Sequence, residues 1–303
     1  MILNLDQLTD RVKSSPGNQK IFAVAHAVDK GIFTAALRAM EEGLGKFIFT
    51  GPEKELRELA EEAGLKEDSS LWGIRDTSDP VESAASAVKL IRDHEADILM
   101  KGMTSTSVLL KAVLNKETGL RGSGVLSHVA AFDLPDRESL LFLTDAAMNI
   151  APDLKEKTEI TANAVDTARK IGFSNPKVAV LAAVETVNPA MEATMHAAAL
   201  TQMNRRGQIK GCTIDGPLAF DLAVSSEAAT QKGIQSEVAG AADILVVPAI
   251  ETGNALYKSL TIFGKGKVGG LITGAKVPIV LTSRADSSDS KLFSITLAAA
   301  AAE

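Results

Sequence analysis

Residues 21–50 read IFAVAHAVDKGIFTAALRAMEEGLGKFIFT, and this stretch decides the fold. Its apolar run at 21–28 predicts a buried strand, and the run KFIFT at 46–50 predicts a second one. Asp29 is a typical helix cap, and the apolar residues between 32 and 40 have helical spacing. Strand, helix and strand in this order form the repeating unit of a parallel sheet covered by helices.

The alternation of strand and helix continues through most of the chain. Further strands are predicted at 71–76, 97–101, 125–133, 140–144, 178–182, 243–247 and 277–282. Further helices are predicted at 53–63, from Pro80, at 104–114, 153–170, 189–203 and from 286. The sequence therefore predicts an α/β protein with two three-layer α/β/α domains and mostly parallel sheets.

One interruption of the alternation suggests a domain boundary. Two predicted strands follow each other directly and are joined by the polar turn Pro135-Asp136-Arg137. We place the first domain at 1–136 plus 286–303 and the second at 137–285. Because ligands of such sheets lie at the carboxyl ends of the strands, we expect an active-site cleft between the domains.

Composition and charge exclude several classes of protein. The net charge is -6, and the densest basic stretch, 264–267, holds only two lysines, which argues against a nucleic-acid partner. A single cysteine, Cys212, cannot form a disulfide framework, and the histidines lack metal-ligand spacing, so no metal is expected. The chain shows neither a signal peptide nor an apolar stretch of membrane length, so we expect a cytoplasmic protein without a membrane partner.

The stretch at 281–290, LTSRADSSDS, is the most specific candidate site. An apolar strand runs into Ser283 and Arg284, and a helix then begins among Asp and Ser residues. The free backbone N–H groups of a helix start, together with a guanidinium, suit a phosphate group. A capped helix with a surface arginine is the competing interpretation.

Two other stretches place polar groups after predicted strands. In MKGMTSTS at 100–107, Gly102 permits a close backbone approach, while Thr104, Thr106 and their neighbours offer hydroxyls to phosphate oxygens. In PAIETGNALYK at 248–258, Asn254 and Tyr257 lie one helical turn apart and share a face. Both stretches are equally typical of turns and capped helices. The stretch at 100–107 is not a P-loop, because GxxxxGK[ST] is absent.

Four ordered motifs give the chain a family resemblance. KGMTSTSVLLKAVL, TIDGPLAFDLA, ADILVVPAIETGNALYKSL and VPIVLTSRADSSDSKL resemble segments of the phosphate acetyl/butyryltransferases. The segments GNALYK and SRADS are more similar to the butyryl branch, because the acetyl branch usually has SRG at the last position. The resemblance is strongest from Asp97 onward.

The resemblance implies a fold and a reaction. Members of the family have two α/β domains of the isocitrate/isopropylmalate dehydrogenase-like superfamily and are usually homodimers or higher homo-oligomers. They reversibly convert acyl-CoA and phosphate into acyl phosphate and CoA, without a further cofactor. The acyl-CoA, phosphate and acyl phosphate are then the partners of this chain.

The resemblance also implies roles for single residues. Ser283 and Arg284 match the Ser-Arg pair of the family. The family's catalytic Asp falls on Asp289, with Ser290 and Asp286 as alternative positions. Lys111 occupies the place of an Arg on the helix after the Gly-Thr loop.

Other substrate-binding candidates and other functions stay open. Thr104, Thr106, Ser127, Asn254 and Tyr257 are assigned to substrate binding, and no residue to a metal. A phosphate acetyltransferase is the nearest alternative. A metal-dependent 2-hydroxyacid dehydrogenase would need a cluster of Asp residues that the sequence does not show, and a non-catalytic CoA-binding protein would not need the Ser-Arg pair.

Overall fold

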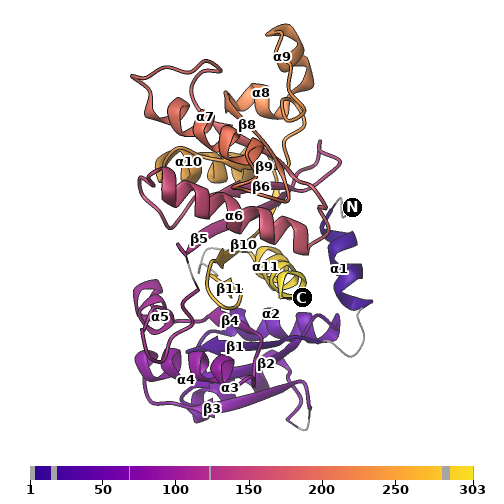
Figure 1. Ribbon diagram of the computed structural model, residues 1–303. Helices are drawn as coiled ribbons and strands as arrows, with labels where there is room; N and C mark the ends of the chain where they lie inside the picture. Colours follow the sequence, from indigo (N-terminus) through magenta and orange to yellow (C-terminus); the bar gives the residue numbers. More distant parts are fainter. Residues whose placement is uncertain (1–3, 15–18, 68, 123, 282–286, 303) are drawn as a thin grey trace. The chain divides into compact units, whose positions relative to one another are not determined.

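Strand β1 (Ile21–Ala25), formed by the first apolar run, pairs in parallel with β2 (Lys46–Gly51) and β4 (Ile98–Lys101). The predicted β-α-β unit is therefore present, with α2 (Lys30–Glu41) as its helix. The computed structural model describes residues 4–14, 19–67, 69–122, 124–281 and 287–302 (Figure 1).

The chain divides into two units. The N-terminal unit comprises Leu5–Gly124 and Gly269–Glu303, and the central unit comprises Met1–Asn4 and Val125–Val268. These divisions lie earlier in the chain than the predicted boundaries at 136/137 and 285/286. Two antiparallel pairs explain the shift. Strand β5 (Ser127–Asp133) pairs with β6 (Leu141–Thr144), so the Pro135 turn lies within the central unit. Strand β10 (Lys267–Thr273) pairs with β11 (Ile279–Val280), so the chain from 269 onward belongs to the N-terminal unit.

The N-terminal unit has the strand order β3-β2-β1-β4-β11-β10, in which only β10 runs antiparallel to its neighbour β11. Its remaining elements are α1 (Leu5–Lys13), α3 (Glu53–Ala63), β3 (Trp72–Asp76), α4 (Pro80–Arg92), α5 (Thr106–Val113) and α11 (Ser288–Ala301).

The central unit has the strand order β5-β6-β9-β7-β8, with β5 antiparallel and the others parallel. Its remaining elements are α6 (Leu154–Lys170), β7 (Lys177–Leu181), α7 (Glu192–Arg205), β8 (Thr213–Leu218), α8 (Phe220–Val224), α9 (Ser226–Gln231), β9 (Ile244–Val246) and α10 (Ile250–Ile262). The prediction of an α/β fold with mostly parallel sheets is confirmed. None of the described helices is long and apolar enough to cross a lipid bilayer.

Helix starts follow the capping residues of the sequence. The carboxylate of Asp29 accepts the backbone N–H of Ile32 at 3.1 Å, as predicted for the start of α2. Pro80 occupies the first turn of α4, where its missing N–H costs nothing, and Asp79 caps that helix. A carboxylate cap satisfies N–H groups that the helix itself cannot pair and contributes about 1 kcal/mol.

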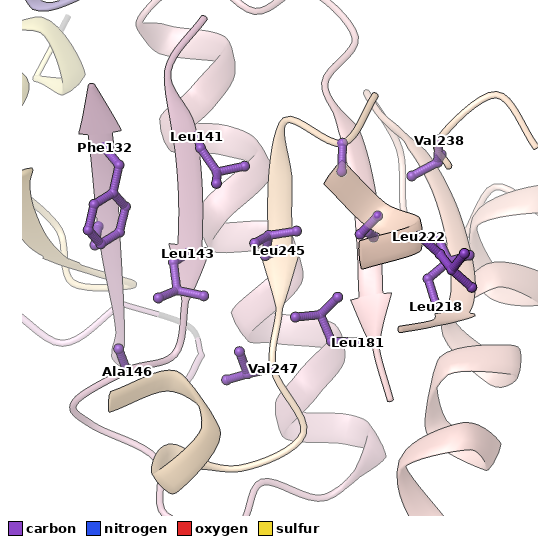
Figure 2. Packing of buried hydrophobic residues seen from close by; sticks show 14 of the residues in the cluster. Phe132, Leu141, Leu143, Ala146, Leu181, Leu218, Leu222, Val238, Leu245 and Val247 are labelled. Atoms are coloured by element: carbon purple, nitrogen blue, oxygen red, sulfur yellow. The ribbon is translucent and has the colours of Figure 1, made fainter. Parts of the chain in front are cut away.

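The core of the central unit is a layer of aliphatic and aromatic side chains that project from neighbouring strands (Figure 2). Phe132, Leu143 and Leu245 come from adjacent strands and are fully buried, so they fix which face of the sheet the helices cover. Each such side chain contributes about 1.5–3 kcal/mol by its removal from water.

Strand β10 was not predicted, because its sequence KVGGLIT contains two glycines that break the strand pattern. The structure explains one of them. A Cβ at Gly269 would lie 2.9 Å from the backbone and ring of Phe293, so glycine lets α11 pack directly against the strand.

Candidate functional site

The strand order of the N-terminal unit indicates a ligand-binding site at the carboxyl ends of β1 and β4. From β1 the chain adds β2 and β3 on one side, and then crosses to β4 on the other side of β1. Parallel α/β sheets bind ligands at the carboxyl ends of the two strands where the order reverses in this way. His26 follows β1 directly, and the loop Gly102-Met103-Thr104 follows β4. We call these four residues the β1/β4 edge.

The loop of the β1/β4 edge is held tightly against the end of β1. The N–H of Met103 donates to the carbonyl of His26 at 2.7 Å, and the N–H of Gly102 donates to that of Ala25 at 2.9 Å. A Cβ at Gly102 would lie 2.4 Å from the His26 carbonyl oxygen, so only glycine permits this approach.

Thr104 is the predicted binding residue whose environment points most clearly to a ligand. Its side chain is 3% exposed, and its buried Oγ1 has no hydrogen-bond partner among the described residues. An unsatisfied buried hydroxyl is costly, by about 1–3 kcal/mol, so such groups usually have a partner. A bound ligand would supply that partner.

Thr106 lies in the first turn of α5 and is exposed. The helix is capped by Ser105, whose Oγ accepts the N–H of Val108 at 3.2 Å. The structure thus brings Thr104 and Thr106 to one helix start, where unpaired N–H groups favour an anion.

Lys111 lies at the other end of α5, in its last turn. Its exposed side chain lines a groove of about 450 Å³ on the surface of α4 and α5. The groove combines aliphatic side chains with the cations Lys89, Arg92 and Lys111. Lys111 is therefore placed to contact a ligand with apolar and anionic parts, about 7.5 Å further along the helix than Thr106.

Asn254 and Tyr257 share one face of α10 in the central unit, as predicted. The amide of Asn254 is exposed and lies 3.5 Å from the carbonyl of Ala146. The ring of Tyr257 packs edge-on against Phe132, with 5.4 Å between centroids, and lies 6.0 Å from the ring of His128.

Ser127 is fully buried at the start of β5. Its Oγ accepts a hydrogen bond of 2.9 Å from Asn163 on α6. The hydroxyl of Ser127 therefore takes part in a hydrogen bond in the interior of the central unit. Its contact with substrate stays a prediction.

Asp145, which was not predicted as a site residue, anchors the loop after β6. Its buried carboxylate accepts the N–H groups of Ala147 and Met148 at 2.8 and 2.9 Å, and the amide of Asn149 at 2.6 Å. A Cβ at Gly253 on α10 would lie 2.5 Å from the Asp145 carbonyl, so α10 packs directly on this loop. The signal was present, because Asp145 follows the predicted strand LLFLT just as Thr104 follows its own strand.

The central unit also contains a mostly apolar pocket of about 680 Å³. It lies at the carboxyl ends of β7 and β9 and is bordered by α10. Its lining includes Leu181, Met191, Phe220, Pro248 and Leu256.

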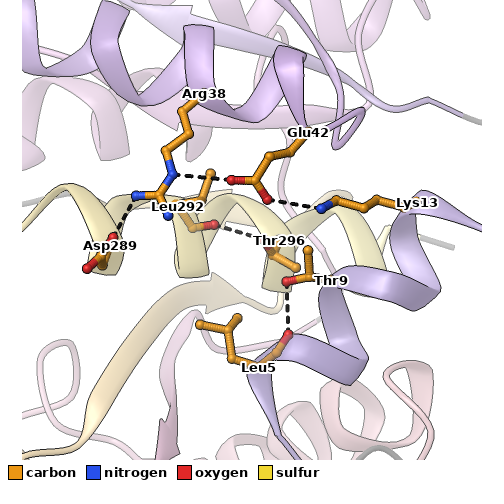
Figure 3. A network of polar contacts seen from close by, with 8 residues as sticks. All are labelled: Leu5, Thr9, Lys13, Arg38, Glu42, Asp289, Leu292 and Thr296. Carbon is orange, nitrogen blue, oxygen red and sulfur yellow. Dashed lines mark hydrogen bonds and ion pairs between the residues drawn. The ribbon is translucent and has the colours of Figure 1, made fainter.

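The predicted catalytic residues Ser283 and Arg284, and the alternative Asp286, lie outside the described residues. Asp289 is described and lies in the first turn of α11, which Ser287 caps through the N–H of Ser290. The Asp289 carboxylate is 67% exposed and forms an ion pair of 2.6 Å with Arg38 on α2 (Figure 3). Ser290, the other alternative, is partly buried beside Ser287.

Arg38 joins Asp289 to a chain of surface charges. Its guanidinium also contacts Glu42 at 3.2 Å, and Glu42 in turn pairs with Lys13 at 3.1 Å (Figure 3). All four side chains are substantially exposed, so each pair contributes only about 0.2–1 kcal/mol to stability.

Neither the cysteine nor a metal cluster offers a reactive centre within the described residues. Burial raises the pKa of Cys212 to about 11, so its thiol is protonated at neutral pH and is a poor nucleophile. Within the described part of the chain, no three His, Cys, Asp or Glu side chains are grouped as metal ligands.

Comparison with known proteins decides the family. The family model described as "Phosphate acetyl/butaryl transferase" matches residues 73–299, which is most of the chain. The chain belongs to the phosphate acetyl/butyryltransferase family. The resemblance seen in the four motifs is therefore confirmed.

Individual members of the phosphate acetyl/butyryltransferase family are similar over nearly their whole length. A probable phosphate butyryltransferase of Bacillus subtilis (strain 168) is 55% identical over 295 residues, 96% of each chain. A phosphate butyryltransferase of Clostridium beijerinckii is 46% identical over 299 residues, covering 99% of this chain and 98% of that one. Among solved structures, a branched-chain phosphotransacylase from Enterococcus faecalis V583 is 39% identical, with a TM-score of 0.82, and covers 94% of this chain and 99% of that chain.

A solved structure with much lower sequence identity has a similar fold. A 4-hydroxythreonine-4-phosphate dehydrogenase from Klebsiella pneumoniae has a TM-score of 0.58 at 13% identity, over 94% of this chain and 100% of that chain. This similarity concerns the fold alone.

Proposed function

We propose that this chain is a phosphate butyryltransferase, which transfers a short acyl group between CoA and inorganic phosphate. The observation that carries the proposal is the identity of 55% and 46%, over almost the whole chain, to proteins named for this activity. The chemistry of the β1/β4 edge supports it, because the buried hydroxyl of Thr104 and the start of α5 are suited to an anionic ligand.

The proposed reaction needs a thiolate, a binding group for phosphate and a donor to the carbonyl oxygen. In the direction that consumes acyl phosphate, the CoA thiol loses its proton to a carboxylate, which we assign to Asp289. The sulfur then attacks the acyl carbonyl carbon, a C–S bond forms, and the bond from that carbon to the phosphate oxygen breaks. Only a few per cent of an alkyl thiol with a pKa of about 8.5 is ionised near neutral pH, so a base accelerates the step.

Arg284 and Ser283 are assigned to stabilise the negative charge that develops on the leaving phosphate and on the carbonyl oxygen during this step. Arg284 binds the phosphoryl oxygens and stabilises the leaving phosphate, since a guanidinium donates two parallel hydrogen bonds. Ser283 donates to the oxygen of the carbonyl as negative charge develops there. The two positions come from the family's Ser-Arg motif, and the two roles are assigned from the chemistry of the side chains.

The described residues supply the remaining binding groups of the proposal. Thr104 and Thr106 donate to phosphate oxygens, and Asn254 and Tyr257 contact substrate from α10. The groove lined by Lys111, Lys89 and Arg92 has the mixture of apolar walls and cations that CoA requires. We further propose that the protein is cytoplasmic, forms a homodimer or a higher homo-oligomer, and uses no cofactor besides its CoA substrate.

CoA release is expected to depend strictly on phosphate or arsenate. With butyryl-CoA as substrate, free thiol should appear only when one of these anions is present, because the site has a binding group for an oxyanion. The measurement is thiol release with and without each anion, and EDTA should leave the rate unchanged. Release at the same rate without either anion would identify a thioesterase instead.

Butyryl-CoA is expected to give a higher kcat/KM than acetyl-CoA. An added methylene in an apolar pocket contributes about 1–3 kcal/mol, so two of them should give a difference of tenfold or more. The apolar pocket beside α10 has room for such a chain. A preference for acetyl-CoA in the same assay would assign the chain to the acetyl branch.

A further inference from the structure

His26 stands out because its backbone is strained where no turn requires it. Its φ angle is 55°, in the left-handed region that non-glycine residues seldom adopt. The other two described non-glycine residues with positive φ, His94 and Lys265, follow the ends of α4 and α10, where left-handed residues commonly end helices. His26 instead ends the strand β1, at the β1/β4 edge. Strain of this kind persists where surrounding contacts enforce it, and it is concentrated at functional sites.

Three contacts hold His26 in this conformation. Its N–H donates to Oγ1 of Thr50 at 3.2 Å, and its carbonyl accepts the N–H of Met103 at 2.7 Å. Its ring nitrogen Nδ1 lies 3.1 Å from Oγ of Ser83 on α4. The backbone of His26 is therefore held against the loop that contains Thr104, and its ring is held against Ser83 on α4.

The contacts of Ser83 determine which ring nitrogen carries the proton. Oγ of Ser83 donates its one hydrogen to the carbonyl of Asp79 at 2.8 Å, because a carbonyl can only accept. Oγ1 of Thr77, at 2.7 Å, and Nδ1 of His26 must then both donate to Ser83. Only this assignment makes all three contacts hydrogen bonds. It leaves Nε2 of His26 with a lone pair.

Nε2 is available to a ligand. It makes no hydrogen bond to any described residue, and the side chain is only partly buried. Burial lowers the pKa of His26 below its usual range, against the opposing charges of Glu55 on α3 and Asp79 before α4. The ring is therefore neutral at pH 7, and Nε2 acts as a hydrogen-bond acceptor.

We propose that His26 is a substrate-binding residue whose Nε2 accepts a hydrogen bond from an amide N–H of the pantetheine arm of CoA. The inference rests on the proposed function. A phosphate dianion offers mainly acceptor oxygens, so it is suited to the hydrogen-bond donors of Thr104 and of the start of α5. The lone pair on Nε2 of His26 instead requires a ligand group that donates a hydrogen bond. In CoA, the amide N–H groups of the arm that carries the thiol supply such donors.

Two substitutions of His26 separate the two ring nitrogens. His26→Asn keeps a donor in the place of Nδ1 and tolerates positive φ, but removes the acceptor at Nε2. It should weaken CoA binding and raise KM for butyryl-CoA about three- to tenfold, with kcat and KM for phosphate unchanged. His26→Gln places an acceptor near the position of Nε2 and should restore most of the loss. His94→Asn is the matched control, because His94 has a φ of 59° and is exposed away from this edge, and it should change nothing.

The pH dependence of CoA binding gives a second test, because a purely structural role of His26 would not make binding depend on the protonation of its ring. When pH falls through the pKa of His26, below about 6.5, Nε2 gains a proton and can no longer accept. Calorimetric titration with CoA over a series of falling pH should then show weaker binding by the wild type once the His26 imidazole is protonated, and no such change for His26→Gln.

The outcomes distinguish the inference from the proposed function. Equal CoA affinity in the wild type and His26→Asn would overturn the inference alone. A loss confined to kcat would also overturn it and would assign His26 to proton transfer. A wild type that neither binds CoA nor releases thiol with phosphate would overturn both.

Discussion

Arg284→Ala is expected to lower kcat/KM about a hundredfold without unfolding the protein. The guanidinium is assigned to the phosphoryl group, where it stabilises charge that develops on the leaving phosphate. Loss of one such contact in a shielded site costs about 3 kcal/mol, which corresponds to about a hundredfold in rate. Arg284→Lys should recover only part of the activity, because lysine keeps the charge but not the two parallel donors.

The measurement is kcat/KM with butyryl-CoA and phosphate, with circular dichroism as a check of folding. Arg206→Ala is a suitable control, because Arg206 is exposed at the end of α7 and is assigned no role in the reaction. Near-normal activity of Arg284→Ala would remove the central assignment of the proposed mechanism.

Asp289→Asn is also expected to lower kcat/KM about a hundredfold at neutral pH, since a positioned base contributes at least that much. The deficit should shrink as pH rises toward the pKa of the CoA thiol, because thiolate then forms without help. The measurement is kcat/KM against pH for the variant and the wild type. A deficit that is the same at every pH would assign Asp289 to positioning rather than to proton transfer.

The ion pair with Arg38 provides the control for Asp289. Arg38→Ala removes the same pair at 2.6 Å but leaves the carboxylate in place. Because the pair is exposed, its loss should cost at most about 1 kcal/mol of stability, and activity should change little. If Arg38→Ala is as inactive as Asp289→Asn, then the pair acts by holding the start of α11 in place, and the base must be sought elsewhere.

Several polar residues follow strands in this chain, and the sequence does not rank them as candidates for the site. Thr104 and Asn254 were selected from this group, whereas His26 and Asp145 have the same position in the pattern and were passed over. What distinguishes His26 is its positive φ and the orientation of its ring by Ser83, a residue 57 positions away in the chain. Asp145 is distinguished by four donors, among them the N–H of His128 at 3.2 Å, that converge on one carboxylate. Neither property has a signature in a single sequence.

Local sequence determined most of the element types, the caps and the family. The apolar runs and the caps Asp29 and Asp79 act over a few residues, so their effect can be read directly from their order. Four motifs in order were enough to indicate the phosphate acetyl/butyryltransferases. The tertiary structure alone decided the unit boundaries, because the pairings of β5 with β6 and of β10 with β11 are contacts between strands. It alone decided which side chains are exposed, buried or already paired, as for Asp289, Ser127 and Thr104, because burial depends on residues that are distant in sequence and become neighbours only when the chain folds.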